Sequence, residues 1–206
     1  CLRNILSQLP KVKNIVCYDI FEAASKKYLD WAREELKVDG RTTMDVQDAL
    51  KDADVVTVAA SRLKPLYIKD EWLKEGVTLL ITGPVQTDAS YWMSTNLIYD
   101  NTKLHETYVQ EAVESGDKEQ YYDGVIGGPI YRLIDAGKMP KLQDSVSLGD
   151  VILGQKEGRK SEKERVTFVA CGMAAFDVGL GYALYQKALE KGIGTKLLLW
   201  DSPFQA

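Results

Sequence analysis

Short apolar runs alternate along the chain with stretches in which apolar residues recur at helical spacing. The short runs are rich in β-branched residues and predict buried strands at 12–19, 54–60, 77–82, 96–100, 166–170 and 196–200. We expect helical segments at 1–9, 20–36, 46–50, 69–74, 104–113, 129–137 and 173–191. Gly40 is expected to stop the second of these helices. Strands alternating with helices indicate βαβ units, so the sequence predicts an α/β fold around a parallel sheet.

The first predicted strand ends on a carboxylate, Asp19, and passes directly into a helix. In a dinucleotide-binding fold an acid at this place accepts hydrogen bonds from the adenosine ribose hydroxyls, and it repels a 2′-phosphate, which favours NAD over NADP. The alternative is an ordinary helix N-cap. The matching first strand and its Gly-x-Gly-x-x-Gly turn are expected about 20 residues upstream, yet Cys1 to Leu9 has a helical pattern. We therefore expect a Rossmann-like doubly wound parallel sheet that is N-terminally truncated, without its first strand and glycine turn.

Small residues follow two later strands. In an open α/β sheet the ligand lies across the carboxyl ends of the strands, where small side chains let the backbone approach a flat ring. Plain core packing is the alternative for each strand end alone, and the pair together favours a shared crevice. The candidate cofactor-binding residues are Asp19, Ile20, Val58, Ala59, Ala60, Ser61, Thr82, Gly83, Pro84 and Val85.

Several other residues have two interpretations. The glycines at 124, 127 and 128 are expected to form a structural turn, because the segment lacks the Lys-Ser or Lys-Thr of a phosphate-binding P-loop. His105 is expected on a solvated helix face. Asp88, after the turn at Gly83-Pro84, and Asp177, the lone acid of an apolar helix, could each serve in proton transfer or accept a core hydrogen bond.

Composition excludes some classes of function. The 206 residues carry a net charge of −4 with acids and bases interspersed, which argues against a nucleic-acid partner. Three scattered cysteines are too few for a disulfide framework or a zinc site, so we expect no metal and a cytoplasmic protein. No secretory signal is visible at the first residues. The apolar stretch 166–185 is expected to be a buried strand and helix rather than a membrane span.

Three segments resemble the ornithine cyclodeaminase and mu-crystallin family. The most specific is 166–177, which reads Val-Thr-Phe-Val-Ala-Cys-Gly-Met-Ala-Ala-Phe-Asp, and 54–65 and 148–154 add support. By resemblance, Asp19 matches the ribose-binding acid, and 58–61 and 82–85 match segments beside the ribose and nicotinamide. The family's cyclodeaminases carry a catalytic Asp shortly after the Gly of that last loop. Here its place falls on Val85 or Gln86, neither of which exchanges a proton as a carboxylate does.

The resemblance also implies a domain arrangement and a function. Residues 1–165 would form a partial NAD(P)-binding Rossmann domain, and 166–206 a late strand, helix and strand returning toward an absent N-terminal substrate and dimerisation domain. We expect an NAD(H)-binding part of a homodimeric enzyme that acts on a small amine, imine or amino acid by hydride transfer, with catalytic residues unknown. The wording at 81–85 and 200–204 is most similar to the tyramine oxidase branch of the family. The alternative is a non-catalytic accessory or ligand-binding protein that keeps the dinucleotide-binding fold.

Overall fold

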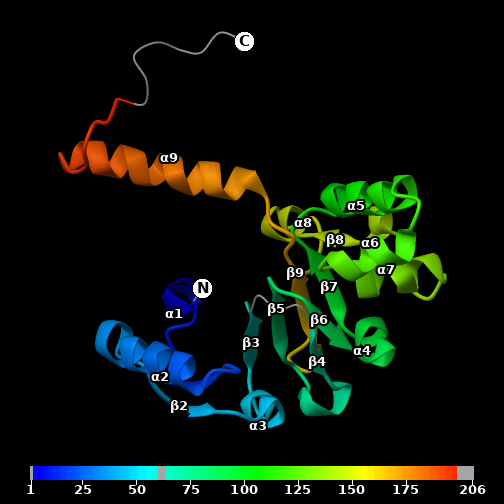
Figure 1. Ribbon diagram of the computed structural model, residues 1–206, viewed down its shortest axis with the longest axis horizontal. Coiled ribbons are helices and arrows are strands. Elements are labelled where there is room, and N and C mark those ends of the chain that lie inside the picture. Colours follow the sequence, from blue (N-terminus) through cyan, green and yellow to red (C-terminus); the bar gives the residue numbers. More distant parts are fainter. Residues whose placement is uncertain (1, 60–63, 199–206) are drawn as a thin grey trace. The chain divides into compact units, whose positions relative to one another are not determined.

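The computed structural model describes residues 2–59 and 64–198 (Figure 1). The chain divides into two compact units, Cys1–Cys171 and Gly172–Ala206. The sheet and the candidate cofactor residues belong to the first unit. The expected boundary between 165 and 166 would have separated the strand at 166–169 from this unit, whereas the structure places that strand inside its sheet.

The largest sheet has five strands that pair in parallel in the order β3-β5-β9-β7-β8. Their bounds are β3 Val55–Val58, β5 Thr78–Ile81, β9 Val166–Val169, β7 Asn96–Tyr99 and β8 Val146–Ser147. The last strand in the sequence, β9, lies between β5 and β7 (Figure 1). Four strands end in register, with Ile81 paired to both Val58 and Val169, and Val169 paired to Tyr99. We call this rim the carboxyl-end edge.

A second sheet contains only β1 (Asn14–Tyr18) and β2 (Asp39–Thr43), paired in parallel. The sequence did not predict β2, because its Asp-Gly-Arg-Thr-Thr has no apolar alternation. Gly40 was expected to stop the preceding helix, and that prediction is wrong, because Gly40 lies within β2. A Cβ at Gly40 would sit 1.9 Å from the Ile15 carbonyl oxygen, so the close approach of the strands requires glycine. The helix ends instead at Lys37, whose φ of 55° is left-handed.

A third sheet pairs two short strands that were not expected, β4 (Leu66–Ile68) and β6 (Val85–Thr87). The predicted helix at 69–74 shrinks to a single 3₁₀ turn, η2 (Asp70–Trp72). The segment 82–85 was expected to be a loop, and it leads directly into β6. Because both strands are only three residues long, their periodicity is too short to be recognised in the sequence.

Helices surround these sheets. The helix expected at 20–36 is α2 (Glu22–Trp31) continued by a π-helical segment, η1 (Ala32–Leu36). Side-chain caps begin three others, where Asp45, Asn101 and Asp117 accept backbone N–H bonds of the first turn. The remaining helical elements of the first unit are α1 Leu2–Gln8, α3 Val46–Leu50, α4 Ala89–Ser94, α5 Thr102–Glu114, α6 Lys118–Gly124, α7 Gly128–Asp135, η3 Leu142–Asp144 and α8 Leu148–Ile152.

The core of the first unit is built around the middle strands of the large sheet. Leu79 and Ile81 of β5 and Val169 of β9 are fully buried, and helices contribute aromatic residues to the same cluster. α6 and α7 pack so closely that a Cβ at Gly128 would lie 1.9 Å from the Tyr122 carbonyl oxygen. This contact explains the glycine-rich turn as a packing requirement.

The described part of the second unit is one helix, α9 (Ala174–Glu190), followed by an irregular segment. The helix exposes large apolar side chains on all sides. Asp177 is also exposed within its unit, so it is no buried core acceptor there. The strand expected at 196–200 does not form over 196–198, and its remainder lies outside the described residues. Across 2–59 and 64–198, no helix has both the length and the apolar character needed to cross a bilayer.

Candidate functional site

Hydrogen bonds join the carboxyl-end edge from strand to strand. The Val58 carbonyl oxygen accepts from both the backbone N and the Oγ1 of Thr82, at 3.0 Å each. On the other side of β5, the Ala170 N–H donates to the Ile81 carbonyl at 3.0 Å. The ends of β3, β5 and β9 are therefore adjacent and fixed, which is the geometry expected of two neighbouring strand ends that share a crevice.

The predicted residues on this edge differ in exposure. Ala59 and Thr82 are exposed beside each other's strands, and Pro84 is half-buried. Gly83 is buried, and Val85 is only 3% exposed because it packs into the core from β6. Ala60 and Ser61 lie outside the described residues. Small exposed residues at adjacent strand ends fit a flat ligand that approaches the backbone.

Asp19 follows the last residue of β1 and is half-buried, and Ile20 after it is 52% exposed. Asp19 Oδ1 accepts the backbone N–H of Phe21 at 2.8 Å, which orients the carboxylate at the strand end. α2 has Phe21 rather than Asp19 as its N-cap. Within residues 2–59 and 64–198, the second oxygen of Asp19 has no hydrogen-bond partner and could accept a ribose hydroxyl. β1 and β3 belong to different sheets, so a meeting of Asp19 with the other strand ends stays a prediction.

The sequence analysis missed a buried polar cluster at the end of β7. His105 was expected on a solvated helix face, and this is wrong because its side chain is fully buried. Its Nε2 lies 2.9 Å from Oδ1 of Asp100, and its Nδ1 lies 2.5 Å from the Tyr131 hydroxyl. The neighbours Lys103 and Gln110, which suggested exposure, lie on the opposite side of α5. The helical spacing of His105 with Val109 and Ala112 was the signal for a buried face.

Asp100 connects this cluster to β9. Its Oδ2 accepts the backbone N–H of Cys171 at 2.9 Å, and its own N–H donates to the Val169 carbonyl at 3.0 Å. Asp100 is therefore part of the carboxyl-end edge. The Cys171 sulfur lies 4.0 Å from His105 Nδ1. Because a carboxylate offers only acceptors, His105 Nε2 must carry the hydrogen that it shares with Asp100.

Burial and hydrogen bonding set the protonation of the cluster. Burial raises the pKa of the Asp100 carboxyl, but hydrogen bonds from His105, Asn101 and Cys171 outweigh it and hold that pKa below its usual range. Burial, aided by the negative charge of Asp100, raises the pKa of the Cys171 thiol to about 12. Burial also raises the pKa of the Tyr131 hydroxyl. The cluster thus holds one ionised carboxylate, with the thiol and the phenol protonated.

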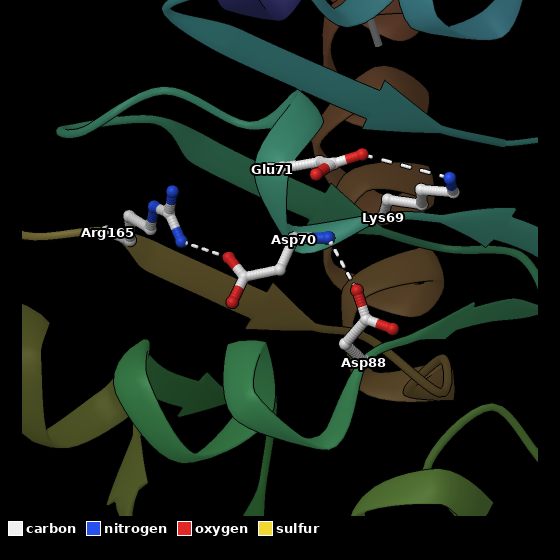
Figure 2. Close-up of a pocket in the computed structure, with 5 residues that line it drawn as sticks. All are labelled: Lys69, Asp70, Glu71, Asp88 and Arg165. Carbon is white, nitrogen blue, oxygen red and sulfur yellow. Dashed lines mark hydrogen bonds and ion pairs between the residues drawn. The ribbon is translucent and has the colours of Figure 1, made fainter.

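An open pocket lies elsewhere, lined by Lys69, Asp70, Glu71, Asp88 and Arg165. Figure 2 shows Arg165 directed at the carboxylate of Asp70, and Asp88 directed at the Asp70 backbone N–H, which it accepts at 2.9 Å. Arg165 immediately precedes β9, so this pocket is near the amino-terminal end of that strand. It is away from the carboxyl-end edge and is no part of the candidate cofactor site.

The surroundings of Asp88 explain its role. Its other oxygen accepts the Tyr67 hydroxyl at 2.5 Å. The hydrogen bond from the Asp70 backbone, followed by that from Tyr67, holds the pKa of Asp88 below its usual range. An acid kept ionised and engaged in this way connects β4, β6 and η2 and is a poor proton donor. In the described residues no group of three or more His, Cys, Asp or Glu side chains is placed to hold a metal.

Comparison with known proteins gives consistent results. N-((2S)-2-amino-2-carboxyethyl)-L-glutamate dehydrogenase of Staphylococcus aureus is 22% identical over 200 residues, which are 97% of this chain and 54% of that protein. The structure of Thermococcus litoralis Δ1-pyrroline-2-carboxylate reductase with NADH and L-proline matches with a TM-score of 0.73 at 21% identity, covering 95% of this chain and 57% of that one. An archaeal alanine dehydrogenase dimer with bound NAD matches with a TM-score of 0.70 at 21% identity, with coverages of 97% and 57%.

These matches support a Rossmann-like fold, and the chain spans about half the length of the relatives it matches. The model of the ornithine cyclodeaminase/mu-crystallin family matches residues 2–192, which is nearly all of the sequence. The motif at 166–177, which carried the resemblance, forms β9 and the start of α9. The chain belongs to the ornithine cyclodeaminase/mu-crystallin family.

Proposed function

We propose that this chain is the NAD(H)-binding part of an oxidoreductase that acts on an amino acid, an imine or an amine. The observation that carries the proposal is the carboxyl-end edge, where exposed Ala59 and Thr82 stand at hydrogen-bonded neighbouring strand ends. Relatives solved with NADH or NAD have the same fold, and the reductase among them was solved with L-proline. An amino-acid or imino-acid substrate is therefore the class that we favour.

In this proposal each predicted residue has a position relative to the cofactor. Asp19, with one oxygen available, would accept the ribose hydroxyls and repel a 2′-phosphate. Ile20, Val58, Ala59, Ala60 and Ser61 would line the ribose side, and Thr82, Gly83, Pro84 and Val85 would flank the nicotinamide through backbone or small side chains. The nicotinamide supplies hydride transfer, and the protein holds it in position and excludes water.

Cyclodeamination is disfavoured by the residues at the place of the family's acid. Val85 is apolar and buried in β6, and Gln86 beside it is exposed but has no exchangeable carboxyl proton. Asp88 is engaged by Tyr67 and Asp70 and cannot take over without breaking both contacts. A hydride-transfer reaction needs no acid at this place. We propose a dehydrogenase or reductase on these grounds.

A second candidate is a non-catalytic accessory protein, which the same Val85 and Gln86 also support. The finer assignment to the tyramine oxidase branch belongs here, and it rests on the wording of 81–85 and 200–204. Steady-state assays with amines and imino acids plus cofactor separate the candidates. Robust turnover by the purified protein alone would remove the accessory role.

We further propose that the chain works within a longer, dimeric, cytoplasmic protein. Residues 1–165 would be part of its Rossmann domain, and 166–206 would lead toward a substrate and dimerisation domain. The relatives are about twice as long, and the archaeal alanine dehydrogenase is a dimer. The exposed apolar side chains of α9 support a covering partner.

The cofactor assignment is tested by titrating NADH and NADPH into the full-length protein and into Asp19→Ser. We expect wild type to prefer NADH, and Asp19→Ser to weaken NADH binding about tenfold while narrowing the preference, because a charge-assisted hydrogen bond is lost. Asp30→Ser is the control, since Asp30 is an exposed acid of α2. Equal affinity of wild type for both cofactors, or no binding of either, would remove the proposal.

A further inference from the structure

The cluster at the end of β7 has a feature that plain core packing does not need. Backbone and side-chain N–H groups from three segments meet the two oxygens of Asp100. Oδ1 accepts from His105 Nε2 at 2.9 Å and from Asn101 N at 2.8 Å, and Oδ2 accepts from Cys171 N at 2.9 Å. A carboxylate satisfies N–H donors on both sides, whereas an amide must direct its own NH₂ group at one of them. This side chain is therefore specified as an ionised acid.

His105 and Tyr131 support that acid from behind. The Tyr131 hydroxyl, 2.5 Å from His105 Nδ1, fixes the ring so that Nε2 faces Asp100. Both side chains are almost fully buried and come from α5 and α7. The aromatic ring of Tyr99 lies edge-on to the imidazole, with centroids 4.7 Å apart. The carboxylate is thus held by the helical layer as well as by its own strand.

The other oxygen of Asp100 acts on the carboxyl-end edge. It holds the Cys171 N–H, and the preceding residue, Ala170, donates to Ile81 of β5. Thr82, which follows Ile81, donates to Val58 of β3. A continuous line of hydrogen bonds therefore runs from Asp100 to the strand ends that carry the candidate cofactor residues.

We propose that Asp100, supported by His105 and Tyr131, is a positioning residue that fixes Ala170 and Cys171 so that the carboxyl-end edge fits a dinucleotide. The inference rests on the proposed function, because it assigns the cluster to the cofactor site rather than to stability alone. Asp100 does not touch the cofactor in this account. It acts through the backbone of β9.

The test compares Asp100→Asn with Tyr91→Phe in the full-length protein. Tyr91 is a matched control, because its buried hydroxyl contacts Thr167 of the same strand at 2.7 Å, away from the carboxyl-end edge. Hydrogen exchange followed by mass spectrometry is read for peptides covering 166–171 and, as a reference, 14–18. We expect Asp100→Asn to speed exchange of 166–171 at least tenfold relative to 14–18, and to weaken NADH binding about tenfold.

Tyr91→Phe is expected to leave NADH affinity within about twofold of wild type even where it lowers stability equally. Tyr131→Phe, which keeps the ring and removes only the supporting hydroxyl, should act in the direction of Asp100→Asn, and it decides the question if that variant does not fold. Unchanged NADH affinity in a folded variant whose 166–171 exchange is faster overturns the inference, and so does unchanged local exchange. If wild type binds neither NADH nor NADPH, the proposed function fails and this inference fails with it.

Discussion

At the scale of single residues, Gly40 shows how one position can require glycine for a reason other than turn conformation. A Cβ at Gly40 would overlap the Ile15 carbonyl, whereas a Cβ at Gly149 of α8 would meet nothing within 4 Å. We expect Gly40→Ala to lower the free energy of unfolding by about 1–3 kcal/mol through overpacking. Gly149→Ala should be neutral or stabilising by up to about 1 kcal/mol. Urea unfolding measures both, and equal midpoints would contradict the β1–β2 packing described here.

The thiol of Cys171 provides a second test at this scale. Its pKa of about 12 compares with 9.0 for a free thiol, so the native protein holds roughly a thousandfold less thiolate at pH 8. We expect iodoacetamide to label Cys171 far more slowly in the native protein than in urea, as followed by peptide mass spectrometry. Because the folded pKa is the raised one, this group's contribution to stability is complete below pH 9 and is lost as pH rises toward 12. Equal labelling rates in the two states would show that the thiol is not buried beside Asp100.

At the scale of elements, the sequence predicted strands with clear β-branched runs and missed short or polar ones. β3, β5, β7 and β9 fall within the predicted ranges, and α3 has the predicted bounds. β2 was missed because it is polar and depends on Gly40 fitting against β1. β4 and β6 were missed because three residues do not establish a period, and they are held by pairing across a sequence separation that local patterns do not contain.

The candidate site was predictable to the same extent. The strand ends after β3 and β5 followed from the rule that parallel sheets bind ligands at their carboxyl ends, and the structure does bring them together. The partners of His105 could not be predicted, because Asp100, Tyr131 and Cys171 come from three segments that meet only after β9 inserts between β5 and β7. A charged neighbourhood in sequence was a poor guide to which side of α5 is buried.

The helix α9 gives an element-scale prediction. Leu180 and Leu184, one helical turn apart, are 63% and 62% exposed. In the 206-residue chain we expect the double variant Leu180→Lys, Leu184→Lys to lower the fluorescence of the dye ANS by about half, because an exposed apolar patch binds the dye. Val113→Lys on α5 is the control, since Val113 is 64% exposed outside that helix. A double variant with the fluorescence of wild type would show that α9 is not an exposed apolar surface.

At the scale of the whole molecule, the two larger sheets each leave one edge strand without a neighbour on one side. Among the described residues β1 pairs only with β2, and β3 pairs only with β5. Asp19 belongs to the first sheet, and the strand ends at 58–59 and 82–84 belong to the other. A dinucleotide that engages all of them must therefore bridge two sheets, and a further strand between β1 and β3 would join them into one.

That arrangement predicts weak cofactor binding by the 206-residue chain alone. In Rossmann folds the pyrophosphate is held by N–H donors of a glycine turn at a helix N-terminus, and no Gly-x-Gly-x-x-Gly occurs in this sequence. Each lost hydrogen bond to a charged group weakens binding by about 1.5–3 kcal/mol, so two such losses convert a micromolar dissociation constant into one of roughly millimolar size. Isothermal titration calorimetry of the 206-residue chain with NADH measures this directly, and Asp19→Ser should change little when the starting affinity is so low. A micromolar dissociation constant would mean that the chain holds the pyrophosphate with donors of its own.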